Sequence, residues 1–130
     1  MQTFLPRVLI IDDCCDERLY LLTPKLDLKD RIIVNIAPKW ETVRELIPSI
    51  QSYDAIVANA LKLHPGPSTL DLIAEIKTSG YRKPIIAVGR ESGSLCWVDE
   101  AKKQGATHSV PRRMDVPEFL VRYFELLSTR

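Results

Sequence analysis

The chain has 130 residues, a length that suits one folded domain with a single hydrophobic core. It is 45% hydrophobic and 27% charged, which excludes a disordered or fibrous chain, and its net charge of +1 gives no overall field that favours nucleic acid or an anionic membrane. Its three cysteines, an odd number, do not form a disulfide framework, and no segment approaches the roughly 20 apolar residues of a membrane-spanning helix. We therefore expect one cytoplasmic domain over residues 1–130.

Short apolar runs, which are typical of buried strands, alternate with segments of helical period along the whole chain. In chain order the predicted strand–helix pairs are 7–11 with 16–26, 32–36 with 40–50, 55–58 with 68–80, 84–88 with 94–104, and 107–110 with a last helix beginning at Asp115. Pro48 is expected to distort the second helix. Ser68 and Asp71 have the spacing of a capping box, and Asp115 is expected to cap the last helix.

This alternation predicts an α/β fold with a doubly wound, five-stranded parallel sheet, (βα)5, covered by helices on both faces as a three-layer α/β/α sandwich. In such sheets the functional site lies at the carboxyl ends of the strands, near the switch in strand order. The residues there include Asp12 and Asp13 after the first strand, Asn59 after the third and Gly89 after the fourth. Two adjacent carboxylates at a sheet edge suit a hard cation such as Mg²⁺.

The order and spacing of four segments resemble the receiver domains of bacterial response regulators, the CheY-like group of flavodoxin-like folds. These segments are RVLIIDD at 7–13, YDAIVAN at 53–59, RKPIIAV at 82–88 and GAT at 105–107. The resemblance implies a domain of two-component or phosphorelay signalling. The family's usual work is to accept a phosphoryl group from a histidine kinase onto an aspartate, with the help of Mg²⁺, and then to switch a partner-binding face.

Carried over residue by residue, the resemblance implies a degenerate phosphorylation site. Asp12 and Asp13 match the acidic pair that holds the metal, but the phospho-acceptor position falls on Asn59, whose carboxamide is a poor nucleophile. Gly89 stands where a hydroxyl residue is expected and has no side chain to bond a phosphoryl oxygen. Ser109 stands at the aromatic switch position. The lysine position after the fifth strand falls on Arg112, and Arg113 follows where the family has a proline.

Charge counting favours a pocket that needs no metal. The family's three aspartates and one lysine carry a formal charge of −2, whereas Asp12, Asp13 and Arg112 carry −1, which Arg90 or Arg113 would bring to neutral. We expect Arg112 or Arg90 to bridge to one of the two aspartates in place of the metal, because arginine stays protonated and binds carboxylates in bidentate fashion. The sequence thus predicts no cofactor, with Mg²⁺ binding weak or absent.

The leading interpretation is a pseudo-receiver that is not an enzyme and that binds a protein, such as a histidine kinase or another signalling protein, without phosphorylation. A homodimer is a further expectation. The resemblance implies contact through the face formed by helix four, strand five and helix five, with Trp97, Ser109 and Tyr123 as candidates. Three alternatives stay open: a drifted domain used only as a scaffold, a working receiver phosphorylated at a noncanonical site with Mg²⁺, and a small-molecule-binding flavodoxin-like domain.

Overall fold

The computed structural model describes residues 5–13, 16, 18–22, 27–59, 68–89 and 95–125, and within these it has a five-stranded parallel sheet. The strands are β1 (Arg7–Ile11), β2 (Ile33–Ala37), β3 (Ala55–Ala58), β4 (Ile85–Val88) and β5 (His108–Val110). Their order across the sheet is β2-β1-β3-β4-β5, so the chain reverses direction of winding between β1 and β3. The predicted fold class is confirmed, and each strand begins within one residue of its predicted start.

The helical segments lie between the strands, as the periodicity predicts. They are α1 (Arg18–Leu21), α2 (Trp40–Leu46), the 3-10 helix η1 (Ile47–Ser52), α3 (Thr69–Thr78), α4 (Leu95–Gln104), the 3-10 turn η2 (Arg113–Asp115) and α5 (Val116–Phe124). The predicted distortion at Pro48 is the change from α2 to η1, because proline cannot donate the hydrogen bond that would continue the α-helix. The first helix is shorter than predicted, since Leu22 instead forms a bridge with Asp27.

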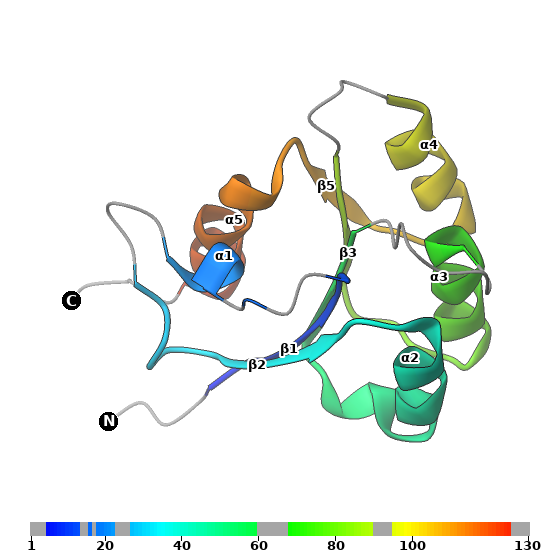
Figure 1. The fold of residues 1–130 in the computed structure, drawn as a ribbon, viewed down its shortest axis with the longest axis horizontal. Coiled ribbons are helices and arrows are strands. Elements are labelled where there is room, and N and C mark those ends of the chain that lie inside the picture. The colour runs from blue at the N-terminus through cyan, green and yellow to red at the C-terminus, as the bar shows by residue number, and fades with distance from the viewer. Residues whose placement is uncertain are drawn as a thin grey trace.

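Helices cover both faces of the sheet and make three layers. Figure 1 shows α2, α3 and α4 on one side of the strands and α1 with α5 on the other. Each face has its own core of buried apolar side chains, one centred on Leu9 and Ile56 and the other on Ile10 and Val57, as alternation along neighbouring strands requires. Strands β3 and β4 are buried along their whole length, which explains their continuous apolar runs.

Local interactions fix where several of these helices begin and end. The predicted capping box is present at α3: the Ser68 hydroxyl accepts from the Asp71 amide at 3.2 Å, and the Asp71 carboxylate accepts from the Ser68 amide at 3.2 Å. Gly105 ends α4 with a φ of +133°, a conformation that favours glycine. Asp115 precedes α5 but makes no side-chain cap, which corrects the expectation for that residue. Among the described residues, no helix is long and apolar enough to cross a membrane.

Candidate functional site

The two residues that follow β1 and β3 meet at the switch in strand order. Ile11 and Ala58 are partners in the parallel ladder, so Asp12 and Asn59 lie side by side at the carboxyl edge of the sheet. The ladder continues one step into this site, where the backbone amide of Asn59 donates to the Ile11 carbonyl at 2.8 Å. The placement predicted from the sequence for these two residues therefore holds in the structure.

Four side chains form a polar cluster around one carboxylate oxygen, and we call them the Asp12 cluster: Asp12, Tyr20, Asn59 and Arg113. The Oδ2 atom of Asp12 accepts a hydrogen bond from the Tyr20 hydroxyl. It accepts another from the side-chain amide nitrogen of Asn59 at 3.3 Å. Arg113 approaches the same oxygen with Nη2 at 2.9 Å and Nε at 3.1 Å. The Tyr20 hydroxyl in turn accepts from Arg113 Nε at 3.3 Å and from Asn59 Nδ2 at 3.4 Å.

The cluster is buried at its centre and half-open at its rim. The side chain of Asp12 is 1% exposed and Tyr20 is fully buried, whereas the side chain of Arg113 is 36% exposed. Burial, together with the hydrogen bond to Asp12, raises the pKa of Tyr20 well above its usual range, so the phenol stays protonated and keeps donating. Burial disfavours the charge on Arg113, but its hydrogen bonds to Tyr20 and Asp12 outweigh this and raise its pKa. The guanidinium also lies over the Tyr20 ring, 5.7 Å from the centroid.

Among the described residues, Arg113 is the arginine that contacts Asp12, and the expectation for Arg112 was wrong by one residue. Arg112 Nε instead donates to Asp115 at 3.4 Å in an ion pair at the surface. Asp115 does not cap α5 because its backbone is already in the right-handed helical region, with φ −87° and ψ −8°, whereas an N-cap residue is typically extended. Asp13 is partly exposed beside Asp12. Arg90, the other predicted bridge, lies outside the described residues.

The Mg²⁺ that the resemblance implies does not fit the residues of this site. A carboxylate oxygen has about two lone-pair positions, and the Oδ2 atom of Asp12 already accepts from three side chains. One of these donors is a permanent cation, and Asn59 supplies an amide nitrogen where the family would supply a carboxylate. Within the described part of the chain, no three His, Cys, Asp or Glu side chains are grouped to hold a metal. Weak or absent Mg²⁺ binding stays a prediction.

Gly89 follows β4 at a point where two backbone segments approach closely. Its amide donates to the Val110 carbonyl at 2.8 Å, and a Cβ built at Gly89 would lie 2.5 Å from the carbonyl oxygen of Pro111. Backbone atoms therefore fill the space where the family carries a hydroxyl side chain. A hydroxyl side chain at this position would therefore require the segment after β5 to move.

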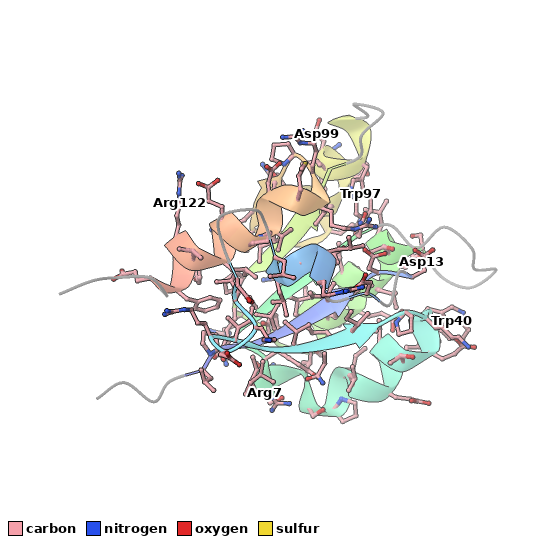
Figure 2. All side chains as sticks on the ribbon, turned by 60° about the vertical axis from the view of Figure 1, so that its left-hand side comes forward. Arg7, Asp13, Trp40, Trp97, Asp99 and Arg122 are labelled. Carbon is pink, nitrogen blue, oxygen red and sulfur yellow. The ribbon has the colours of Figure 1, made fainter. Side chains whose placement is uncertain are left out.

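The partner-face candidates differ in how they are placed. Trp97 lies on α4 (Figure 2) and is half-buried against the core. Its indole nitrogen donates to the Val88 carbonyl at 2.7 Å. This bond favours a packing role over that of an exposed anchor. Ser109 is half-buried in β5, and the ring beside it belongs to His108, which contacts Phe119 at 5.4 Å between centroids. Tyr123 is 44% exposed on α5.

Sequence reasoning missed Tyr20 as a member of the site and misassigned the arginine. Tyr20 lies on α1, eight residues after Asp12, and only the way α1 packs on the sheet brings its hydroxyl to the carboxylate. Its sequence signal was weak, since a tyrosine on the buried side of a helix is usual. Arg113 was recognised only as a charge near the pocket, because the turn after β5 decides which of two adjacent arginines faces inward.

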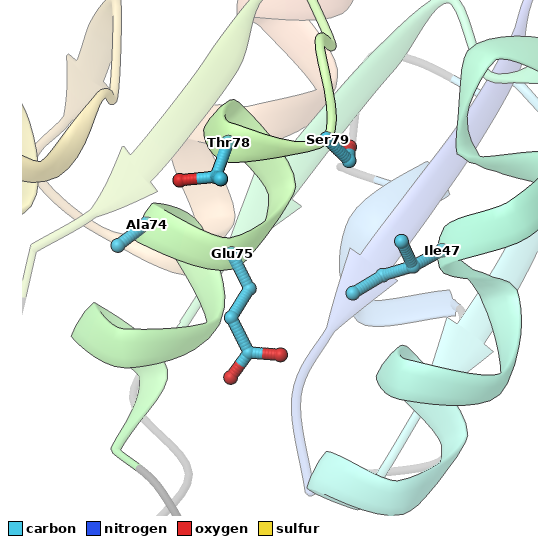
Figure 3. A pocket seen from close by; sticks show the side chains of 5 residues that line it. All are labelled: Ile47, Ala74, Glu75, Thr78 and Ser79. Atoms are coloured by element: carbon cyan, nitrogen blue, oxygen red, sulfur yellow. The ribbon is translucent and has the colours of Figure 1, made fainter.

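A depression of about 410 Å³ lies between η1 and α3, lined by Ile47, Ala74, Glu75, Thr78 and Ser79 (Figure 3). Its one carboxylate, Glu75, is already in an ion pair with Arg44 at 3.0 Å. This hollow therefore gives no support to the small-molecule alternative.

Neither a protein-family model nor the sequence of a curated protein matches the chain. Solved structures do match it. The receiver domain of NtrC4 from Aquifex aeolicus aligns with a TM-score of 0.70 and 19% identity over 95% of this chain and 97% of that one. The response regulator domain of Thermotoga maritima CheB aligns with a TM-score of 0.65 and 20% sequence identity, over 98% of this chain and 99% of that one.

The chemotaxis response regulator CheY4 of Vibrio cholerae gives a TM-score of 0.63 at 18% identity, over 92% of this chain and 98% of that one. The fold is that of a receiver domain. At such identities the likeness concerns the fold, and the chemistry of this chain has to follow from its own residues.

Proposed function

We propose that the chain is a pseudo-receiver: a receiver-fold module of a two-component or phosphorelay pathway that acts in the cytoplasm by binding a protein, without phosphotransfer. The observation that carries the proposal is the side chain after β3. Asn59 stands at the position that would supply the nucleophile. Its side-chain amide donates to Asp12, whereas an acceptor aspartate would supply a carboxylate oxygen that attacks the phosphorus atom. A carboxamide forms no acyl phosphate, so the ordinary reaction lacks its first step.

Two other aspartates that could act as noncanonical acceptors are engaged elsewhere. Asp54 precedes β3 at the opposite edge of the sheet, where its carboxylate accepts from the Arg7 amide at 2.8 Å. Asp71 is part of the capping box of α3. Neither lies next to Asp12, and this supports a function that does not depend on phosphorylation.

Intact-mass spectrometry after incubation with acetyl phosphate and Mg²⁺ tests this proposal. We expect no phosphoryl adduct on this chain under conditions that label an active receiver domain run in parallel. A stoichiometric, acid-sensitive and Mg²⁺-dependent adduct would overturn the proposal and would favour a noncanonical acceptor, which peptide mapping would then identify.

An aromatic surface on β5 and α5 supports the protein-binding part of the proposal. We define it by four rings: His108, Phe119, Tyr123 and Phe124. Tyr123 stacks on Phe119 with 6.0 Å between centroids and meets the edge of His108 at 5.6 Å, so its exposed ring is held in place. Rigid aromatic side chains make good anchors because they bury a large area and lose little conformational freedom.

The aromatic surface is tested by exchanging its exposed ring. Tyr123→Ser should abolish co-purification of a partner from the source cells, or self-association in sedimentation if the partner is a second copy. Arg122→Ala, next to it on α5 and also exposed, is the matched control and should bind normally. Equal binding by the wild type and Tyr123→Ser would refute this choice of face.

A further inference from the structure

We infer that the Arg113 guanidinium is a built-in substitute for the divalent cation at Asp12, and that it fastens the beginning of α5 to the end of β1. This inference concerns the same pocket as the proposed function but does not rest on it. A module that never accepts phosphate could still have an open, metal-binding carboxylate. Different experiments would therefore refute the absence of phosphotransfer and the replacement of the cation by Arg113.

The geometry of the charge pair is the first support. Asp12 is, among the described residues, the one carboxyl side chain that is buried, and a buried carboxylate needs a compensating positive charge. Arg113 supplies it with two nitrogens within 3.1 Å of Oδ2. Tyr20 and Asn59 fill the remaining positions around this oxygen. A metal ion would have to displace a permanent cation and two neutral donors to bind there.

The path of the backbone is the second support. At the end of β4 the absence of a side chain at Gly89 lets the Pro111 carbonyl come to the place where a Cβ would be. The chain then enters the turn η2, whose first residue is Arg113. The neighbouring Arg112 is directed to Asp115 instead. Gly89 and Arg113 thus belong to one arrangement, in which the segment after β5 closes over the site.

The ion pair between Arg113 and Asp12 also affects the position of α5, which carries part of the aromatic surface. Arg113 and Asp12 are separated by 101 positions in the chain, and η2 leads directly into α5. The ion pair therefore holds α5 in one position relative to the sheet. In a receiver that switches, a divalent cation would supply this positive charge only when bound. Here the charge is covalently part of the chain, so the α5 surface is fixed at all times.

Thermal unfolding of two adjacent arginine variants, with EDTA or with millimolar Mg²⁺, tests the inference. Arg113→Ala should lower the Tm by about 10 °C in EDTA, because it removes the Arg113 charge from a buried carboxylate. Arg112→Ala removes only a surface pair and should lower the Tm by about 3 °C or less. Mg²⁺ should raise the Tm of Arg113→Ala by several degrees and leave the wild type unchanged.

Three results would overturn the inference: equal losses for the two variants, a Mg²⁺ response in the wild type as large as in Arg113→Ala, or no Mg²⁺ response in Arg113→Ala. If Arg113→Ala does not fold, a double-mutant cycle of Asp12→Asn and Arg113→Gln replaces it. Arg113→Gln should then lower the Tm less than half as much in the Asp12→Asn background as in the wild type. Equal losses in both backgrounds would show that Arg113 does not act on the charge of Asp12.

Discussion

Replacing Asn59 by aspartate restores the family's acceptor residue and is the sharpest perturbation of the site. The change turns an amide that donates to Asp12 Oδ2 at 3.3 Å into a second carboxylate facing the first. It removes one hydrogen bond and creates a like-charge contact beside a buried group. We expect Asn59→Asp to destabilise the domain rather than to revive it.

The magnitude follows from the separation of the two side chains. Two unit charges at this distance repel by about 5 kcal/mol at an effective dielectric constant of about 20, and the lost hydrogen bond adds about 1 kcal/mol. Arg113, which contacts the same oxygen at 2.9 Å, offsets part of this. We therefore expect a net loss of about 2–4 kcal/mol in the free energy of unfolding near pH 7.

Urea unfolding at about pH 7.5 and about pH 5 measures this loss and its sign. A neighbouring negative charge raises the pKa of the new carboxyl in the folded state, so the loss grows as pH rises above the unfolded value and is smaller at about pH 5. Asn35→Asp, at an exposed position of β2, is the matched control: a carboxylate there can still accept from the Tyr53 hydroxyl, now 3.3 Å from Asn35 Oδ1, so stability should change by about 0.5 kcal/mol or less. The variant should also remain poorly labelled by acetyl phosphate. A neutral or stabilising effect, or robust labelling, would refute this reasoning.

Three further predictions follow from single contacts. Gly89→Thr should destabilise the domain by about 1–3 kcal/mol in urea unfolding, because its Cβ would meet the Pro111 carbonyl; an unchanged midpoint would contradict the close approach. Burial raises the pKa of Tyr20, so its contribution to stability is complete below about pH 10, where the unfolded tyrosine begins to ionise, and is lost as the pH rises toward the folded value, at about 1.4 kcal/mol per pH unit. Burial raises the pKa of Tyr81 as well, so Tyr20→Phe should remove only the Tyr20 part of the alkaline slope, whereas Tyr123→Phe should leave the slope unchanged. Equal alkaline slopes for the two variants would count against the buried phenol. Trp97→Phe leaves the Val88 carbonyl without its 2.7 Å donor and should lower stability by about 1 kcal/mol, a loss that chemical denaturation should detect.

The sequence was sufficient to predict the sheet because local patterns and burial agree there. Strands β3 and β4 are buried on both faces, so their apolar runs are continuous and end where the chain leaves the sheet. The capping box at Ser68 depends on a spacing of three residues and is likewise local. The sequence also predicted that Asp12 and Asn59 lie at the same edge of the sheet, since parallel strands bring their carboxyl ends to one edge.

The composition of the site could not be read in the same way. Which of Arg112 and Arg113 turns inward depends on the backbone after β5, and that backbone depends on a contact between Gly89 and Pro111 that spans 22 positions of sequence. Tyr20 enters the cluster through the packing of α1, which no spacing rule fixes. These are tertiary effects, and residue patterns of short range carry little information about them.

The central claim is that the pocket at Asn59 is closed to phosphoryl transfer by its own side chains. An NMR titration of the whole chain with beryllofluoride and Mg²⁺, which together mimic the phosphoryl group on an acceptor carboxylate, tests it most directly. We predict that the backbone amide signals of Asp13, Asn59 and Gly89 stay unchanged at concentrations that saturate an active receiver domain. Saturable shifts of these three signals, spreading to α5, would contradict the account.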